Sequence, residues 1–313
     1  MLLIIGAGEI GREYAKTVRH LGIGDVDILS RRADPAEALR REFGFHRAFG
    51  GDFARLPEII GRYDRIIVAA PVDTLSRYLT SLAELTRAPV LVEKPAALTA
   101  AELAAHIDCH PQQNAMVALN RLFYPSVLTL RQRLSDDPVL SADFSFTEWL
   151  HRIDLTRYAS PVLARWGIAN SIHVLSTVFD IIGHPVTLHA EVSGAGRIAW
   201  HPSGTVFAGS GRSEAGILFS YASNWISAGR WSAAFRTEKG SYHLEPFEGL
   251  SFCPKGRIDR EEIEPVWGGE LKCGFEGMVR GWLSGEKIDE RFGLPQMLRH
   301  LTTAERIIYP DKP

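Results

Sequence analysis

The first 120 residues alternate between short apolar segments and longer amphipathic ones. The apolar segments are rich in leucine, isoleucine and valine, which is typical of parallel strands buried on both faces. They are residues 2–5, 25–30, 65–71, 89–95 and 114–120. The amphipathic segments repeat apolar side chains three and four positions apart, as helices do. They are residues 10–20, 35–44, 73–86 and 99–107. This alternation predicts a doubly wound parallel sheet with helices on both faces.

The last of these helices carries a recognisable start signal. Thr99 is predicted to be its N-cap, and Glu102, three residues later, completes a capping box.

The pattern changes after Asn120. Residues 187–252 have mostly strand character broken by glycine, serine and proline, which is typical of antiparallel strands with one buried face. Residues 168–183 and 295–309 have helical periodicity. We therefore predict two domains, residues 1–120 and residues 121–313, the second an α/β domain with a mostly antiparallel sheet. We expect the last helix to pack back on the first domain.

Three glycines follow the first strand with the spacing G-x-G-x-x-G, in "IIGAGEIGREYA". Gly6 would permit a tight turn, Gly8 the close approach of a bulky group, and Gly11 close packing of the next helix on the strand. That helix would direct the amides of its first turn, Glu9 and Ile10 included, at a pyrophosphate. The alternative is a merely tight strand–helix turn. The position of the motif between a strand and a helix favours a dinucleotide-binding Rossmann domain.

The end of the second strand, "DILSRR", bears on the choice of cofactor. An acidic residue at this point binds the adenosine ribose in NAD-dependent domains of this kind. Ser30 takes that position here, followed by Arg31 and Arg32. A hydroxyl and a guanidinium suit a 2′-phosphate, so we expect NADP rather than NAD. Two alternatives stay open: the arginines are ordinary surface charges, or Asp27 is the acidic residue of an NAD site.

Composition excludes several other classes of protein. The chain has 313 residues, 45% apolar and 23% charged, with a net charge of −2, as in soluble globular proteins. No basic stripe indicates nucleic acid, and no polybasic or long apolar segment indicates a membrane. Cys109, Cys253 and Cys273 lack the spacing of a metal or disulfide motif, so we expect reduced thiols and no metal. With nothing before the first strand that resembles a leader, we expect a cytoplasmic protein.

Three further motifs narrow the class. Glu93-Lys94-Pro95 ends an apolar segment in "VLVEKPAALTAAEL", Asn120-Arg121 follows in "VALNRLFYPSV", and His173 lies in "NSIHVLSTVFDIIG". Their order and spacing resemble the Gfo/Idh/MocA oxidoreductases, a family that includes glucose-fructose oxidoreductase and inositol dehydrogenase. The resemblance covers nearly the whole chain, including the closing "AERIIY" helix.

The resemblance implies a Rossmann domain followed by an α/β domain with a large open, mostly antiparallel sheet. In such proteins this sheet often mediates assembly, so we expect a homodimer or homotetramer. It also implies a nicotinamide cofactor and a sugar, cyclitol or nucleotide-sugar substrate. The peptide bond before Pro95 is often cis in this family. By position, further cofactor contacts would be Ala70, Pro71, Glu93, Lys94, Asn120 and Arg121.

The resemblance also suggests the catalytic residues. His173 matches the family's catalytic histidine, and Lys94 matches the lysine that reaches toward the reacting hydroxyl. Oxidation of a secondary alcohol needs a hydride acceptor and a proton acceptor, and an imidazole titrates near neutral pH. We therefore expect His173 to be the general acid or base and Lys94 to orient the oxygen and relay its proton. The alternatives are a core histidine and an ordinary surface lysine.

The chain departs from the family pattern around this histidine. The aspartate expected four residues earlier is Ala169, the expected glycine is Ser171, and a later aspartate is Ser176. The usual carboxylate is therefore missing, and Asn170 and Ser171 could offer neutral hydrogen bonds in its place.

Substrate contacts are expected beside these residues. The candidates are Tyr124, Arg152 and Asn170, together with Lys94 and His173. Trp149, His151, Trp225 and Arg230 are weaker candidates, because aromatic residues on strands mostly pack. Arg152 or Arg230 could hold a carboxylate or a diphosphate.

These observations favour an NAD(P)-dependent oxidoreductase acting on a sugar, amino sugar or nucleotide sugar. Two other hypotheses remain. The missing carboxylate favours a non-catalytic, cofactor-binding sensor or interaction protein, while retention of Lys94 and His173 argues against it. The third hypothesis is a reductase of an imine, an enone or a similar substrate that needs only hydride and a mild acid.

Overall fold

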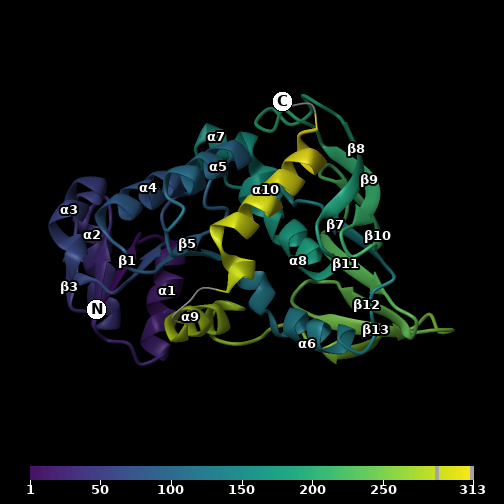
Figure 1. Ribbon diagram of the computed structural model, residues 1–313, viewed down its shortest axis with the longest axis horizontal. Helices are drawn as coiled ribbons and strands as arrows, with labels where there is room; N and C mark the ends of the chain where they lie inside the picture. The colour runs from purple at the N-terminus through teal and green to yellow at the C-terminus, as the bar shows by residue number, and fades with distance from the viewer. Residues whose placement is uncertain (286–288, 311–313) are drawn as a thin grey trace. The chain divides into compact units, whose positions relative to one another are not determined.

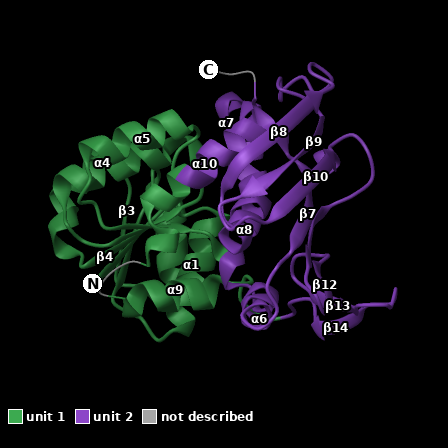
Figure 2. Ribbon diagram, turned by 45° about the vertical axis from the view of Figure 1, so that its right-hand side comes forward, with its two compact units in different colours: residues 1–120, 269–298 green, residues 121–268, 299–313 purple. Residues whose placement is uncertain are grey.

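The computed structural model describes residues 1–285 and 289–310. The chain forms two compact units (Figure 2). The first comprises residues 1–120 and 269–298, and the second comprises residues 121–268 and 299–313. No helix in the described part of the chain is both long enough and apolar enough to cross a lipid bilayer.

The first unit contains a six-stranded sheet in the order β3-β2-β1-β4-β5-β6, in which all neighbouring strands are parallel (Figure 1). The strands are β1 (Leu2–Ile5), β2 (Val26–Leu29), β3 (Arg47–Phe49), β4 (Arg65–Val68), β5 (Val90–Glu93) and β6 (Ala115–Ala118). This is the doubly wound order, in which strands are added toward one edge of the sheet up to β3 and toward the other edge from β4 on. Every residue of β1, β2 and β6 is buried, as their apolar sequences predicted. The predicted Rossmann fold is confirmed.

The helices of the first unit are α1 (Glu9–His20), α2 (Ala33–Phe43), α3 (Leu56–Ile59), α4 (Leu75–Leu85), α5 (Ala100–Cys109) and α9 (Phe275–Ser284). Four of them, α1, α2, α4 and α5, match the predicted ones, while α3 and α9 were not predicted. The Thr99 side chain accepts the Glu102 amide at 3.1 Å, so this cap is confirmed. The Glu102 carboxylate accepts the Leu98 amide rather than the Thr99 amide, which shifts the return bond of the capping box by one residue.

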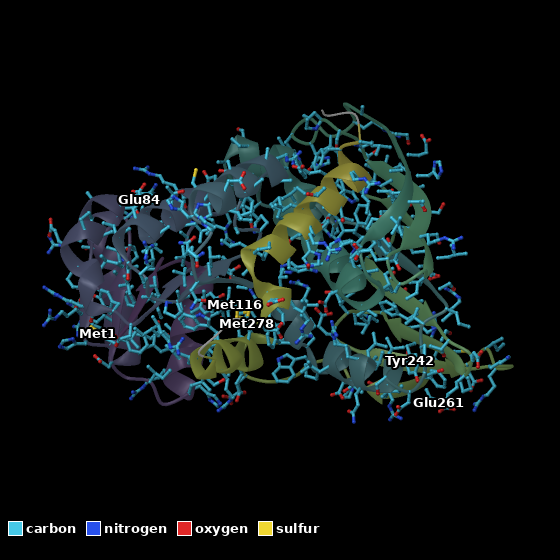
Figure 3. The ribbon with its side chains drawn as sticks, viewed as in Figure 1. Met1, Glu84, Met116, Tyr242, Glu261 and Met278 are labelled. Carbon is cyan, nitrogen blue, oxygen red and sulfur yellow. The ribbon has the colours of Figure 1, made fainter. Side chains whose placement is uncertain are left out.

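Residues 269–298 belong to the first unit, although the sequence placed everything after 120 in the second domain. The Asn120 side-chain amide donates to the Cys273 carbonyl at 3.0 Å, and the Tyr14 and Phe275 rings lie 4.9 Å apart. Met116 of β6 and Met278 of α9 are both buried in this unit (Figure 3). The segment returns because its apolar side chains complete the core beside α1, a long-range contact that no local pattern encodes.

The second unit contains an eight-stranded sheet in the order β14-β13-β12-β11-β7-β10-β9-β8. Its strands are β7 (Ser141–Phe146), β8 (Pro185–Ser193), β9 (Val206–Ser213), β10 (Leu218–Asn224), β11 (Trp231–Arg236), β12 (Gly240–Leu244), β13 (Leu250–Pro254) and β14 (Glu261–Glu264). Only the β7–β10 pair is parallel, so the predicted mostly antiparallel sheet is confirmed. Burial alternates along β7 and β10, as expected of a sheet with one face packed on helices.

The second unit also contains helices, two of which pack on strands of this sheet. The helices are α6 (Pro125–Leu134), α7 (Ser160–Ala164), a π-helical turn (Gly167–Ser171), α8 (Ile172–Ile182) and α10 (Leu294–Ile308), of which residues 299–308 belong to this unit. Phe144 of β7 meets Phe179 of α8 edge to face, with ring centres 5.7 Å apart. The sequence predicted one helix over residues 168–183. The structure instead begins it with the π-helical turn, a feature often found at functional sites.

Candidate functional site

The glycine turn of the first unit has the geometry that the motif predicted. Gly6 has a φ of +111°, and a side chain at this position would collide with the Ala69 carbonyl. A side chain at Gly11 would collide with the Gly6 carbonyl, so α1 packs directly on the turn. A Cβ at Gly8 would meet nothing within 4 Å. Gly8 is also the N-cap of α1 and supplies no side chain, which leaves the first-turn amides to bind an anion. The turn therefore fits a dinucleotide pyrophosphate.

The loop after β2 carries the residues expected to choose the cofactor. Arg31 and Arg32 are exposed, while Ser30 is buried and its hydroxyl donates to the Arg32 carbonyl. Asp27 is fully buried and accepts a hydrogen bond from the Tyr63 hydroxyl at 2.7 Å. The structure therefore excludes the alternative in which Asp27 binds the ribose.

The structure adds an acidic residue to this region that the sequence did not single out. Asp52 follows β3, accepts a hydrogen bond from the Tyr78 hydroxyl, and lies within the electrostatic reach of Arg31 and Arg77. Burial raises the pKa of Asp52, and the two arginines oppose that rise. The Gly51 amide contacts the Arg31 carbonyl at 3.4 Å, so the two loops are neighbours. No local motif marks Asp52, because only the β2–β3 pairing brings it to Arg31.

The Glu93-Lys94-Pro95 motif lies where β5 ends. The Lys94–Pro95 bond is cis, and Glu93 accepts a hydrogen bond from the Tyr14 hydroxyl of α1 at 2.7 Å. Burial raises the pKa of Glu93, while the charge of Lys94 and the Tyr14 hydroxyl act in the opposite direction. Glu93 therefore ties β5 to α1 and fixes the backbone from which Lys94 projects.

Other predicted cofactor residues fall on the neighbouring strand ends. Ala70 and Pro71 follow β4, and the Pro71 carbonyl accepts from both the amide and the hydroxyl of Thr74. Asn120 is 4% exposed and follows β6. Strand ends on this side of a parallel sheet are where such folds bind nucleotides. Contact of these residues with the cofactor stays a prediction.

In the second unit, His173 is the second residue of α8 and is 5% exposed. Its ring centre lies 6.0 Å from that of Trp231 on β11. The guanidinium carbons of Arg121 and Arg230 lie 4.6 and 4.4 Å from the centre of the same Trp231 ring. One imidazole, one indole and two guanidinium groups thus lie together in this unit. The sequence predicted two of these residues, Arg121 and His173, as site residues. We call these residues, with Glu148, Asn170 and Ser171, the His173 cluster.

Glu148, like Trp231, is a residue of this cluster that the sequence did not identify. It follows β7 and is 3% exposed. Its carboxylate accepts the Ser171 hydroxyl at 2.7 Å and the Asn170 amide nitrogen at 3.0 and 3.1 Å. Arg230 lies 3.8 Å away. Burial raises the pKa of Glu148, and these donors and the Arg230 charge lower it. The turn that holds Ala169 is therefore bonded to a carboxylate from the end of β7.

The π-helical turn that carries Asn170 and Ser171 is held from behind. A side chain at Gly167 would collide with Ile308, so the turn lies directly against the end of α10. The neighbouring Tyr309 hydroxyl bonds the His201 ring at 3.0 Å, and the Arg165 guanidinium lies 4.2 Å from the Tyr309 ring centre. These contacts support the π-helical turn, which directly precedes α8.

The remaining substrate candidates are not all part of this cluster. Tyr124 is 4% exposed and is the N-cap of α6, beside Arg121. Arg152 is exposed, in a short turn beside Trp149. Trp225 is buried and its indole donates to the Phe146 carbonyl at 3.1 Å, so it is a core residue.

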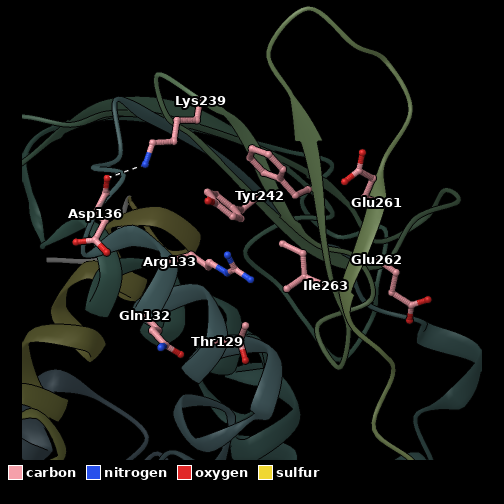
Figure 4. A pocket seen from close by; sticks show the side chains of 10 residues that line it. Thr129, Gln132, Arg133, Asp136, Lys239, Tyr242, Glu261, Glu262 and Ile263 are labelled. Atoms are coloured by element: carbon pink, nitrogen blue, oxygen red, sulfur yellow. Dashed lines mark hydrogen bonds between the residues drawn. The ribbon is translucent and has the colours of Figure 1, made fainter.

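A separate groove of about 700 Å³ lies between α6 and the strands β12 to β14 of the second unit (Figure 4). None of the predicted site residues lines it. It mixes positive and negative groups, and Lys239 donates to the Asp136 carbonyl at its rim. Within residues 1–285 and 289–310, no group of three or more potential metal ligands is found.

Comparison with known proteins agrees with this geometry. Residues 1–121 match the family described as "Oxidoreductase family, NAD-binding Rossmann fold". The protein is therefore an oxidoreductase of the NAD-binding Rossmann class. The matching model is that of the Gfo/Idh/MocA family, so this N-terminal part agrees with the resemblance found in the sequence.

Solved structures resemble the whole chain in fold. UDP-N-acetylglucosamine 3-dehydrogenase GnnA from Acidithiobacillus ferrooxidans is 15% identical, with 98% of this chain and 96% of that chain covered and a TM-score of 0.75. A levoglucosan dehydrogenase in complex with NADH and levoglucosan is 15% identical, with 98% and 96% covered and a TM-score of 0.76. An oxidoreductase from Agrobacterium radiobacter with NAD+, L-tartaric acid and magnesium is 16% identical, with 98% and 94% covered and a TM-score of 0.79. Comparison with curated protein sequences gives no match.

Proposed function

We propose that the protein transfers a hydride between a nicotinamide and a carbon that bears a hydroxyl or carbonyl group in a carbohydrate-like substrate. The observation that carries the proposal is the position of His173, which starts a buried helix beside Trp231, with hydrogen-bonding side chains on the preceding turn. The fold-level relatives that act on a nucleotide sugar and on levoglucosan support this substrate class.

The proposed chemistry assigns the proton to protein side chains. When bound, the nicotinamide supplies the hydride acceptor or donor. His173 takes the hydroxyl proton during oxidation and returns it to a carbonyl during reduction, because an imidazole exchanges protons near neutral pH. Lys94, projecting from the turn that Glu93 anchors, orients the reacting oxygen and relays its proton. Asn170 is expected to bind a neighbouring substrate hydroxyl.

For the cofactor, we propose NADP as the preferred form within an NAD-binding family. The exposed Arg31 and Arg32 support a 2′-phosphate, and the burial of Asp27 removes one acidic competitor. Asp52 beside Arg31 opposes the preference, since a carboxylate repels a phosphate. Fold-level relatives bind NADH and NAD+.

Within the substrate class, we favour a sugar, amino sugar or nucleotide sugar. Arg121 and Arg230 over Trp231 form a cationic, aromatic surface that suits an anionic group beside a sugar ring. We also expect a cytoplasmic homodimer or homotetramer assembled through the exposed face of the second sheet. Light scattering of the purified protein tests the assembly.

The experiment that tests the function is a turnover screen. Purified protein is incubated with NAD+ or NADP+ and a panel of polyols, sugars, amino sugars and UDP-sugars, and reduced nicotinamide is followed at 340 nm. We expect turnover with at least one of these substrates and its loss in His173→Asn. His189→Asn, on the exposed edge strand β8, is the matched control and should retain turnover. Nicotinamide binding without turnover of any alcohol or of the matching carbonyls would contradict the proposal and favour the sensor hypothesis.

A further inference from the structure

The catalytic side of the second unit contains a buried carboxylate in a place that the family pattern does not predict. Position 169 holds alanine, yet Glu148 brings a carboxylate to the same turn from the end of β7. It is 3% exposed, so it is enclosed by protein and reaches a substrate only through its neighbours.

We propose that Glu148 is a positioning residue that sets Asn170 as a hydrogen-bond acceptor for a substrate hydroxyl. This role rests on the proposed function. An ionised carboxylate only accepts hydrogen bonds. Both Glu148 oxygens lie within 3.1 Å of the Asn170 amide nitrogen, so both contacts are made by that nitrogen as donor.

This fixed orientation determines which end of the Asn170 amide faces a ligand. With its nitrogen turned toward Glu148, the amide oxygen points the other way, and Asn170 is itself only half-buried. Asn170 therefore offers a substrate a hydrogen-bond acceptor, as an aspartate would. The negative charge stays on the buried Glu148 behind it. The preferred partner is a hydroxyl group, which donates a hydrogen bond.

Two further contacts hold the charge of Glu148 in place. The Ser171 hydroxyl donates to Oε1 at 2.7 Å, and Arg230 lies 3.8 Å from Oε2. Arg230 is 40% exposed and lies over Trp149 and Trp231, so Glu148 also keeps this guanidinium next to the His173 cluster. Glu148 thus links β7, the π-helical turn and the loop before β11.

The test is a double-mutant cycle between Glu148→Gln and Asn170→Ala. Glutamine keeps the size of the side chain but turns a hydrogen-bond donor toward Asn170 and Ser171. We expect kcat/KM to fall about 10- to 150-fold, mainly through KM, because the Asn170 bond forms when the substrate binds. In the Asn170→Ala background the same change should cost less than about threefold. Glu148→Asp, which retains the charge, should recover part of the loss.

Asp137→Asn is the matched control. Asp137 is also a buried carboxylate of the second unit. It accepts a hydrogen bond from the hydroxyl of Thr237, which follows β11, at 2.7 Å. Its loss should lower the melting temperature without changing KM. An equal effect of Glu148→Gln and Asp137→Asn on KM would overturn the proposal, as would a full cost of Glu148→Gln in the Asn170→Ala background.

A second readout separates this proposal from the proposed function. The side-chain amide NMR signals of Asn170, identified by their loss in Asn170→Ala, should shift in Glu148→Gln and stay in place in Asp137→Asn. If the wild-type protein turned over no alcohol or carbonyl, the proposed function would fail while this measurement still decided the orientation of Asn170. Unchanged Asn170 signals in Glu148→Gln would overturn the role of Glu148 in either case.

Discussion

The glycine turn of the first unit and the His173 cluster of the second unit are built from different parts of the chain. The turn is made of backbone from one continuous segment, and its key residues lack side chains. The His173 cluster is made of side chains from four separate segments: residues 121, 148, 170–173 and 230–231. A backbone site depends on spacing, so a motif describes it. A side-chain site depends on positions in space, so one of its members can move along the chain and still perform its task.

We expect the largest effect from a substitution in the glycine turn. Gly11→Val places a branched side chain against the Gly6 carbonyl, so the turn and α1 must separate. We expect nucleotide binding to become undetectable by nicotinamide fluorescence and the melting temperature to fall. Gly8→Ala is the informative control, since nothing lies within 4 Å of its Cβ. It should fold normally but bind nucleotide more weakly. Unchanged nucleotide binding by Gly8→Ala would refute the prediction that the nucleotide lies close to Gly8.

A substitution in the His173 cluster should instead impair catalysis and leave nucleotide binding intact. His173→Asn removes the proposed proton acceptor but not the nucleotide turn, so kcat should fall by about 10²- to 10⁴-fold with nucleotide affinity unchanged. Steady-state kinetics and fluorescence titration of the same preparation measure both. A variant that loses nucleotide affinity in parallel with kcat would show that the two regions do not divide the work in this way.

Acid should act more strongly on the second unit. Burial lowers the pKa of His184 and His201 to about 4 and of His300 to about 3. The unfolded chain binds protons at these histidines from about pH 6.5 downward and the folded chain does not, so stability falls with falling pH. The loss is about 3 kcal/mol each for His184 and His201, developing between pH 6.5 and about pH 4. For His300 it is about 5 kcal/mol and continues to about pH 3.

Melting curves at pH 7 and pH 5 measure this loss. His300→Gln removes one titrating group, so the pH dependence of its melting temperature should be shallower than that of the wild type, whatever its stability at pH 7. An unchanged slope would mean that His300 is not a buried neutral group.

A smaller effect is expected at the ribose loop. Arg31→Ala should weaken NADPH binding about tenfold or more, as expected for loss of a charged hydrogen bond to phosphate, and leave NADH binding within twofold. Arg41→Ala, which removes an exposed arginine of α2 that is paired with Glu37, is the control. Tighter binding of NADH than of NADPH by the wild type, unaltered by Arg31→Ala, would show that Asp52 outweighs the two arginines.

The smallest effect should come from the support of the π-helical turn. Tyr309→Phe removes the hydroxyl that bonds His201, and we expect a loss of about 1 kcal/mol of stability. A modest rise in KM should accompany it, because the turn carrying Asn170 rests against this end of α10. Urea unfolding and steady-state kinetics check the two parts.

The sequence by itself determined the features whose cause is local. The buried strands β1 and β6, the cap at Thr99 and the glycine turn follow from side-chain polarity, capping chemistry and the absence of a Cβ, which act over a few residues. The antiparallel character of the second sheet was predicted from strand-like segments broken by glycine, serine and proline.

Only the tertiary structure decided what depends on contacts between distant segments. It assigned residues 269–298 to the first unit, enclosed Asp27 within β2 and brought Asp52 toward Arg31. It also placed Glu148 beside a turn more than twenty residues later in the chain, where its carboxylate bonds Asn170 and Ser171. Such pairings arise because a sheet sets strands side by side regardless of their separation in sequence, and no local pattern records which side chains then meet.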